Sequence, residues 1–234
     1  MRIAVTRPRE DSERTAATLR SRGHVVLIAP LLKVEPVSAE LRTNCGGVII
    51  TSANAANAIA THPARDALIK LPLFAVGPRS AESARHAGFS DIMTADGDVR
   101  DLLQMLAARR ADIPEPLLYL AGEDRTTDLI AELASRGIVA EVAVIYRAVI
   151  VPFPPELTEA LTRGEVDAVL HYSRRSADSY LIGAEQAGII AQALDVRHFC
   201  LSPQIAAPLA AAGAAKVVVA PRPDEAALIA ILRP

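Results

Sequence analysis

The sequence has few cysteines and no surplus of positive charge. Its 234 residues include two cysteines, Cys45 and Cys200, which lie far apart and without CxxC spacing. This argues against a disulfide framework or a zinc site and fits a reducing compartment. The formal net charge is −2, so nothing in the composition indicates a nucleic acid or an anionic membrane as a partner.

Long uninterrupted apolar runs are also missing, although 51% of the residues are hydrophobic and can form a sizeable core. Met1-Arg2 leads straight into the short run IAVT, and no secretory hydrophobic region is visible. The stretch AAPLAAAGAAKVVVA is interrupted by Pro208, Gly213 and Lys216, which makes it too broken to span a bilayer. We therefore expect a soluble, cytoplasmic protein.

The usual motifs of cofactor and nucleophile chemistry are absent. Neither GxGxxG nor GxxxxGK[ST] occurs, and there is no G-x-S-x-G elbow. The histidines have no HxxxH spacing, and core packing explains His198 and Cys200, which alternate along one apolar run, better than a metal does. We expect no cofactor and no metal. Lysine is rare, so the positive charge is nearly all arginine, which suits either a compositional bias or a carboxylate-rich ligand.

What the sequence does contain is a regular alternation of short apolar runs with Ala/Leu/Arg stretches of helical period. Continuous apolar runs bounded by turns are typical of parallel strands that are covered on both faces. The alternation predicts an α/β protein with doubly wound sheets. The predicted strands are 3–6, 25–29, 47–51, 73–76, 91–95 (the weakest), 117–121, 142–146, 168–172, 198–201 and 216–220.

The chain also repeats itself in three blocks that recur in the same order. In the first pair of blocks, both helices end in Ser-Arg-Gly. The pairs are 14–33 with 128–147, 47–60 with 167–180, and 74–89 with 199–214. Recurrence of this kind predicts two α/β units of similar build.

The boundary between the units is open from the sequence. A tandem arrangement would divide the chain near Pro114-Glu115-Pro116. The stretches KVEPVS (33–38) and RAVIVPFPP (147–155) are more linker-like, because their prolines favour extended chain and they follow equivalent blocks. If these two segments run side by side, the first block joins the last part of the chain, and the middle forms a lobe of its own. Periodicity does not choose between the two arrangements.

Residues at the carboxyl ends of the strands are the most informative, because ligands of open parallel sheets bind there. They are mainly hydroxyl, arginine and glycine residues that precede a helix: Thr6, Arg7, Thr51, Ser52, Gly77, Ser80, Gly122, Tyr146, Ser173, Arg174, Ser176 and Ser202. The serines can be N-caps that satisfy backbone N–H groups. The same helix starts can also bind carboxylate or phosphate. The stretch ITSANAANA (50–58) and its echo in the second repeat favour such an anion site.

Taken in order along the chain, these pieces resemble the uroporphyrinogen-III synthase family. The resemblance spans essentially the whole sequence, and its strength lies in the ordered set rather than in any one piece. One departure is Ile205, which follows Ser202-Pro203-Gln204 where the family often has a threonine, so no ligand role is assigned to it. The matching segments are VTRP (5–8), 49–58, 74–89, 118–137, VIYRA (144–148), 169–180 and 201–223.

The resemblance implies a particular fold. Two similar, flavodoxin-like, doubly wound parallel-sheet lobes would be joined by a two-segment β-ladder hinge. Lobe 1 would contain residues 1–33 and 152–234, lobe 2 would contain 38–146, and the linkers would be 34–37 and 147–151. This selects the arrangement in which both ends of the chain share one lobe.

The resemblance also implies a reaction. The family cyclises hydroxymethylbilane, a linear tetrapyrrole rich in carboxylates, to uroporphyrinogen III with loss of water and inversion of the last ring. Tyr146 is then the predicted catalytic residue, a proton donor for loss of the hydroxyl, although from the residues alone it can equally be a buried phenol. The predicted substrate-binding residues are Thr6, Arg7, Ser52, Asn54, Gly77, Ser80, Gly122, Arg125, Ser173, Arg174, Ser176 and Ser202.

The expected partner is the small-molecule substrate. We expect a monomer, with at most transient contact with the preceding pathway enzyme. The main alternative is a non-catalytic two-lobe binding protein for a polycarboxylate, a class that is usually exported. A nucleotide-sugar transferase and a degenerate regulatory relative are further alternatives.

Overall fold

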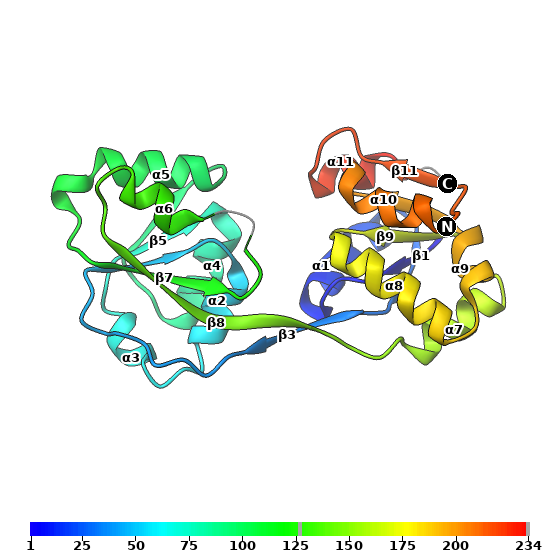
Figure 1. Ribbon diagram of the computed structural model, residues 1–234, viewed down its shortest axis with the longest axis horizontal. Coiled ribbons are helices and arrows are strands. Elements are labelled where there is room, and N and C mark those ends of the chain that lie inside the picture. The colour runs from blue at the N-terminus through cyan, green and yellow to red at the C-terminus, as the bar shows by residue number, and fades with distance from the viewer. Residues whose placement is uncertain (126–127, 233–234) are drawn as a thin grey trace. The chain divides into compact units, whose positions relative to one another are not determined.

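The chain divides into two compact units in the computed structural model, which describes residues 1–125 and 128–232 (Figure 1). Unit 1 comprises Met1–Lys33 and Val149–Pro234, and unit 2 comprises Val34–Ala148. Both ends of the chain therefore belong to unit 1, and the middle forms unit 2. Residues 126–127 of the family-like segment 118–137 lie outside the described residues.

Unit 1 contains one parallel sheet. Its strands are β1 (Arg2–Val5), β2 (Val25–Ile28), β9 (Ala168–His171), β10 (Arg197–Cys200) and β11 (Val217–Val219). They lie in the order β11-β10-β9-β1-β2, and each neighbouring pair is parallel. Counted along the chain, this is the 2-1-3-4-5 order of flavodoxin-like folds.

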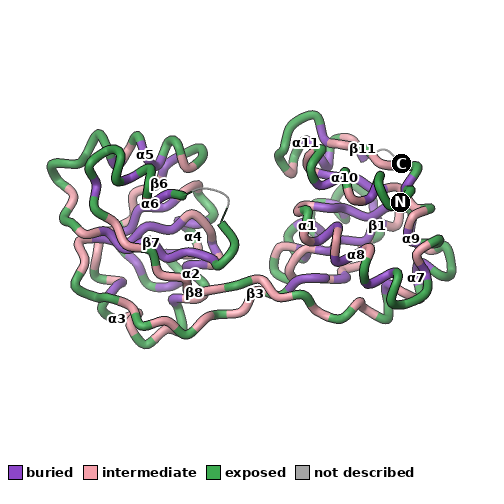
Figure 2. Tube along the Cα trace, in the orientation of Figure 1, coloured by how far each residue is buried: buried purple, intermediate pink, exposed green. Residues whose placement is uncertain are grey.

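Helices cover both faces of this sheet. One face packs against α1 (Arg9–Ser21) and α11 (Glu225–Ala230). The other face packs against α7 (Pro155–Thr162), α8 (Arg174–Gln186), α9 (Ile190–Asp195) and α10 (Pro203–Ala211). Successive residues of the central strands are therefore buried, as Figure 2 shows for both units. This double cover explains why the strands read as continuous apolar runs.

Unit 2 repeats this plan. Its strands are β3 (Leu32–Pro36), β4 (Gly47–Ile50), β5 (Leu73–Val76), β6 (Ile92–Ala95), β7 (Leu117–Gly122) and β8 (Ala140–Ile150), in the order β3-β8-β7-β4-β5-β6. From β8 to β6 every pairing is parallel. One face packs against α2 (Ala53–Ile59), α3 (Arg65–Leu68) and α4 (Gly77–Ala87), and the other against α5 (Val99–Ala108) and α6 (Leu129–Ala134). A short 3-10 turn, η1, spans Arg110–Asp112.

The repeated sequence blocks correspond to equivalent elements of the two units. The series β1-α1-β2 matches β7-α6-β8, and β9-α8-β10-α10-β11-α11 matches β4-α2-β5-α4-β6-α5. With these equivalences the sheet orders β11-β10-β9-β1-β2 and β6-β5-β4-β7-β8 are the same. The prediction of two similar parallel-sheet units is therefore confirmed, with the two-strand part first along the chain in unit 1 and last in unit 2.

Strands β3 and β8 form the predicted two-segment ladder. The Val37 amide donates to the Ile145 carbonyl at 2.8 Å, and the Val151 amide donates to the Leu31 carbonyl at 3.1 Å. Because the partner's number falls as the residue number rises, the two strands are antiparallel. Strand β8 is longer than the predicted 142–146, because it begins at Ala140 and the following linker residues continue it as extended chain. The expectation that Tyr146 ends a strand is therefore wrong, since Tyr146 lies inside β8. In the part of the chain that the structure describes, no helix has both the length and the apolar character needed to cross a membrane.

Candidate active site

Each sheet has a point at which two neighbouring strands cross over in opposite directions along the sheet, through helices on opposite faces. In unit 1 this switch point lies between β1 and β9, which continue into α1 and α8. In unit 2 it lies between β7 and β4, which precede α6 and α2. Open α/β sheets bind their ligands beyond the carboxyl ends of the strands at such points. The two switch points are therefore the first places to look for a site.

The switch point of unit 2 contains a pocket of about 150 Å³. Its walls carry two phenols, a threonine hydroxyl, a guanidinium and a carboxylate. Thr51 Oγ1 and the Tyr119 hydroxyl are hydrogen-bonded at 2.9 Å, and Arg125 Nη1 donates to the Gly122 carbonyl at 2.9 Å. The lining residues are Thr51, Val99, Tyr119, Gly122, Asp124, Arg125, Leu129 and Tyr146.

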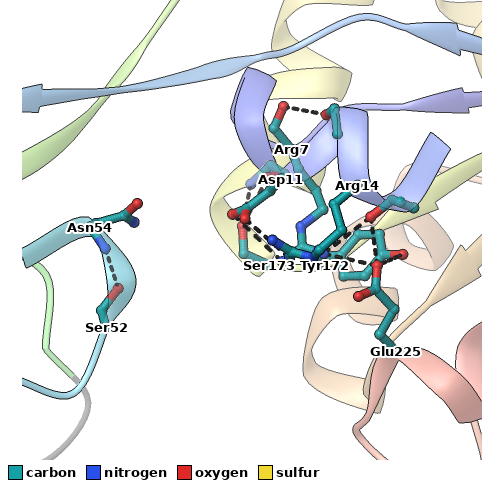
Figure 3. Close-up of polar contacts among 11 residues, drawn as sticks. Arg7, Asp11, Arg14, Ser52, Asn54, Tyr172, Ser173 and Glu225 are labelled. Carbon is teal, nitrogen blue, oxygen red and sulfur yellow. Dashed lines mark hydrogen bonds and ion pairs between the residues drawn. The ribbon is translucent and has the colours of Figure 1, made fainter. Parts of the chain in front are cut away.

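Tyr146 presents a half-buried phenol to this pocket. Burial raises its pKa, a hydrogen bond with the Ser52 side chain lowers it, and the charges of Tyr119 and Asp124 raise it further. The net effect is a pKa above the ordinary value near 10, so the phenol is protonated at neutral pH. Ser52 is the N-cap of α2, and its Oγ accepts from the Asn54 amide at 3.2 Å (Figure 3). The phenol can therefore donate a proton or a hydrogen bond to a bound molecule.

The switch point of unit 1 is filled by the protein's own side chains. Arg7 Nη1 lies 3.0 Å from Glu225 Oε1 and 3.3 Å from Thr15 Oγ1, and Arg7 Nη2 lies 3.6 Å from Asp11 Oδ2. The guanidinium carbon also lies 4.1 Å from the centre of the Tyr172 ring. The Arg7 side chain is only 16% exposed. A substrate carboxylate would have to compete with two internal carboxylates for this arginine.

Glu225 is the centre of the unit 1 network (Figure 3). Its Oε1 accepts from the Thr15 hydroxyl at 2.5 Å, from the Tyr172 hydroxyl at 3.0 Å and from Arg7. Burial raises the pKa of Tyr172, and the negative charge of Glu225 adds to that shift. The network ties the ends of β1 and β9 to α1 and α11, which indicates a structural role.

Several other predicted residues are buried or form hydrogen bonds within their own unit. Thr6 is fully buried, and its hydroxyl donates to the Leu170 carbonyl at 3.1 Å. Ser80 and Ser176 are buried as well. Ser173 caps α8, because its Oγ accepts from the Ser176 amide at 3.1 Å and lies 2.9 Å from Ser176 Oγ. The capping interpretation is therefore confirmed for Ser173, as it is for Ser52. It is wrong for Ser80 and Ser176, which lie inside α4 and α8 and not at their N-caps.

Of the remaining predicted residues, Gly77 belongs to unit 2 but does not line its pocket, and Arg174 and Ser202 belong to unit 1. Gly77 begins α4 with a φ of +73°, a conformation that favours glycine. Arg174 is exposed, and its Nε lies 3.8 Å from Asp178 Oδ2. Ser202 precedes α10 without a side-chain cap hydrogen bond. The pocket therefore brings together Gly122, Arg125 and Tyr146, with Ser52 bonded to Tyr146.

Sequence reasoning missed Tyr119 as a pocket residue. Tyr119 lies in the middle of an apolar strand, where only its hydroxyl distinguishes it from a core residue. The register pairs it with Ile49 of β4, two residues before Thr51. The sequence signal for this residue was a single tyrosine in an apolar run, next to a strand that leads to a threonine. Nothing local could have linked Glu225 to Arg7, which are 218 residues apart.

The fold and the pocket define a class of protein: a two-unit, flavodoxin-like α/β protein with a phenol and hydroxyl site at a strand-end switch point. The family profile of uroporphyrinogen-III synthase HemD matches residues 13–230. The chain belongs to the uroporphyrinogen-III synthase family.

Solved structures of the same family are similar to this chain. The crystal structure of uroporphyrinogen-III synthetase from Helicobacter pylori 26695 has 17% identity over 99% of this chain and 98% of that one, with a TM-score of 0.68, and it supports the fold. A mutant uroporphyrinogen III synthase from the extremely thermophilic bacterium Thermus thermophilus is 21% identical over 95% of this chain and 94% of that one, with a TM-score of 0.49. A comparison with curated proteins gave no match.

Proposed function

We propose that the protein cyclises hydroxymethylbilane to uroporphyrinogen III, with loss of water and inversion of the last pyrrole ring, and is thus a hydro-lyase of tetrapyrrole biosynthesis. Family membership supports the reaction. The observation that carries the residue assignment is the protonated Tyr146 phenol in a pocket at the unit 2 switch point. No finding favours the alternative of a non-catalytic binding protein.

The reaction requires one proton donor and no nucleophile from the protein. The electron-rich terminal pyrrole expels its hydroxyl as water once that oxygen receives a proton, which leaves an azafulvene cation. Tyr146 supplies the proton from its phenol. Attack at the substituted carbon of the last ring is followed by fragmentation and reclosure, and the α-carbon that forms the final bond then loses its proton, which restores the phenol. A positioned general acid contributes rate without any cofactor.

The pocket is too small for the whole substrate. Small-molecule sites have volumes of about 300–1,000 Å³, whereas this pocket has about 150 Å³. It can therefore hold one end or one substituent of the tetrapyrrole, and the rest must lie along other surfaces. Holding a reactive chain in one conformation can by itself supply several kcal/mol.

Burial and hydrogen bonds within the protein shorten the list of predicted substrate-binding residues. We keep Arg125, Ser52 and Asn54 in unit 2, and Ser173 and Arg174 in unit 1, as groups that bind substrate carboxylates with nearby backbone amides. Gly77 and Ser202 stay as predictions. Three of the predicted residues are buried and Arg7 is held by Glu225, so we leave out Thr6, Ser80, Ser176 and Arg7.

The cellular setting belongs to the same proposal. We propose a cytoplasmic monomer that receives its substrate from the preceding pathway enzyme through transient contact. Its two cysteines are unpaired, as in proteins of reducing compartments.

The decisive assay supplies freshly prepared hydroxymethylbilane and separates the product isomers. Type III uroporphyrinogen should form in proportion to enzyme concentration. The matched control without enzyme should give the type I isomer. Type I alone in the presence of folded protein would contradict the assignment, and binding without conversion would favour the polycarboxylate-binding alternative.

A further inference from the structure

The position of Tyr146 depends on an irregularity between β7 and β8. Ala121 pairs with Val144, but the next residue, Gly122, pairs with Tyr146. Strand β8 therefore advances by two residues where β7 advances by one, and Ile145 is the extra residue. A bulge of this kind redirects the side chains that follow it.

The packing shows what the bulge does. Ala143 and Ile145 contact the apolar cluster between the sheet and α2 and α4, as alternate residues of one strand face should. Tyr146 is the very next residue, and it packs against the same cluster. In a regular strand, Ile145 and Tyr146 would point to opposite faces. The bulge thus brings the phenol to the side on which Thr51 and Ser52 precede α2.

Gly122 provides the space that the ring then occupies. A Cβ atom built on Gly122 would lie 2.7 Å from Cε2 and Cζ of Tyr146 and 2.9 Å from its hydroxyl oxygen. These distances are shorter than non-bonded contacts allow. The backbone of Gly122 is outside the left-handed region, so the position demands glycine for space rather than for conformation.

The backbone around this contact is held in place. The Glu123 amide donates to the Tyr146 carbonyl at 2.9 Å, and Arg125 donates to the Gly122 carbonyl at 2.9 Å. A side chain added at Gly122 would therefore push on the movable partner, which is the Tyr146 ring. The expected result is a folded protein with a displaced phenol.

We propose that Gly122 is a positioning residue for Tyr146: its missing side chain lets the phenol lie across the end of β7 and present its hydroxyl to the pocket. This inference rests on the proposed function for its catalytic consequence and deepens it. Its geometric basis is independent of any reaction, since it consists of the bulge, the close approach and the two backbone hydrogen bonds.

The first test measures the ring position and needs no substrate. The chain has four tyrosines, so ring-labelled tyrosine NMR resolves them, and Tyr146→Phe assigns the signal. In Gly122→Ala we expect the Tyr146 signal to shift and its phenol pKa to move toward the ordinary value, while Tyr172 and Tyr180 stay unchanged. The control is Gly183→Ala in α8 of unit 1, where the added Cβ would meet the Phe153 ring; it should leave the Tyr146 signal in place.

The second test measures cyclisation in a double-mutant cycle. Gly122→Ala should lower kcat by about tenfold with little change in KM, because a misplaced proton donor loses part of its catalytic effect. In a Tyr146→Ala background, which has no ring to displace, the same change should have no further effect. A structural role unrelated to Tyr146 would give the same loss in both backgrounds.

Two results would overturn the proposal: an unmoved Tyr146 signal in Gly122→Ala, or equal kcat losses with and without the ring. If the wild-type protein made no type III isomer, the proposed function would fail, but the NMR shift would still decide whether Gly122 positions Tyr146.

Discussion

The two units share one topology but differ in what lies at their switch points. In unit 2, the first residue of α5 is Val99, which follows the N-cap Asp98 and lines the open pocket. In unit 1, the equivalent residue is Glu225, which follows the N-cap Asp224 and accepts hydrogen bonds from three side chains. Equivalent backbone positions thus hold an apolar wall in one unit and a carboxylate that fills the space in the other. The difference shows that side chains, and not the shared fold, decide which switch point has an open pocket.

The cores of the two units also differ in their side chains. Unit 1 has a fully buried pair, His171 and His198, with Nε2 and Nδ1 3.1 Å apart and the Tyr180 ring edge-on to both. When the two units are aligned on the N-caps Ser173 and Ser52, Ile50 of β4 is the residue equivalent to His171. Burial lowers the pKa of both histidines, to about 4 for His198. Unit 1 therefore has titratable groups in its core where unit 2 has an aliphatic side chain.

The largest expected effect is acid sensitivity of unit 1. The folded pKa values of His171 and His198 are below the unfolded value near 6.5, so the folded state binds fewer protons. The histidines therefore do not lower the free energy of unfolding above about pH 6.5. Below that pH the free energy of unfolding falls as the pH drops toward 4, by up to about 1.4 kcal/mol per pH unit for each histidine. Amide hydrogen exchange at about pH 7 and about pH 4.5 should show unit 1 opening before unit 2. A His171→Ile/His198→Val variant that keeps the full wild-type pH slope would show that the histidines are not the cause.

The next effect is on the unit 1 network. Glu225→Val introduces the residue type of the equivalent Val99 and leaves three donors without their acceptor. We expect the free energy of unfolding in urea to fall by about 2 kcal/mol, less than for a fully buried pair because Glu225 is 33% exposed. The matched control is Glu13→Val, which removes an exposed i,i+4 pair with Arg9 and should cost less than about 0.5 kcal/mol. Equal losses in the two variants would mean that the network adds no stability.

Tyr146→Phe should separate catalysis from stability. Removal of the phenol hydroxyl should lower kcat by roughly 10- to 100-fold, with little change in unfolding. The counterpart in unit 1, Tyr172→Phe, loses the bond to Glu225 and should cost about 1 kcal/mol of stability while kcat is kept. Complete loss of cyclisation in Tyr146→Phe would contradict a reaction carried mainly by orientation, and an unchanged kcat would exclude Tyr146 as the donor.

The smallest effect concerns the helix caps. Ser173→Ala removes a cap hydrogen bond and should cost about 1 kcal/mol. Ser202 makes no side-chain cap hydrogen bond, so Ser202→Ala should cost only a few tenths of that. Thermal unfolding of the two variants checks the order, and a larger loss for Ser202→Ala would contradict the capping interpretation.

The strands and the repeat could be predicted because they depend on local pattern. All ten predicted runs form strands, and even the weakest, 91–95, contains β6. The residues of the unit 2 pocket were predictable only near the ends of strands, as Gly122 and Arg125 are. The surroundings of Arg7 were not, because its acceptor Glu225 comes from a helix 218 residues away. The bulge that turns Tyr146 was also invisible, since an extra residue in an apolar strand leaves no mark in its composition.

The most direct measurement is the rate of type III isomer formation per folded molecule in Glu225→Val, compared with Tyr146→Phe. If chemistry belongs to the unit 2 pocket and the unit 1 network is structural, Glu225→Val should keep the wild-type rate at a temperature where it remains folded. A loss as large as that of Tyr146→Phe would contradict this division of roles.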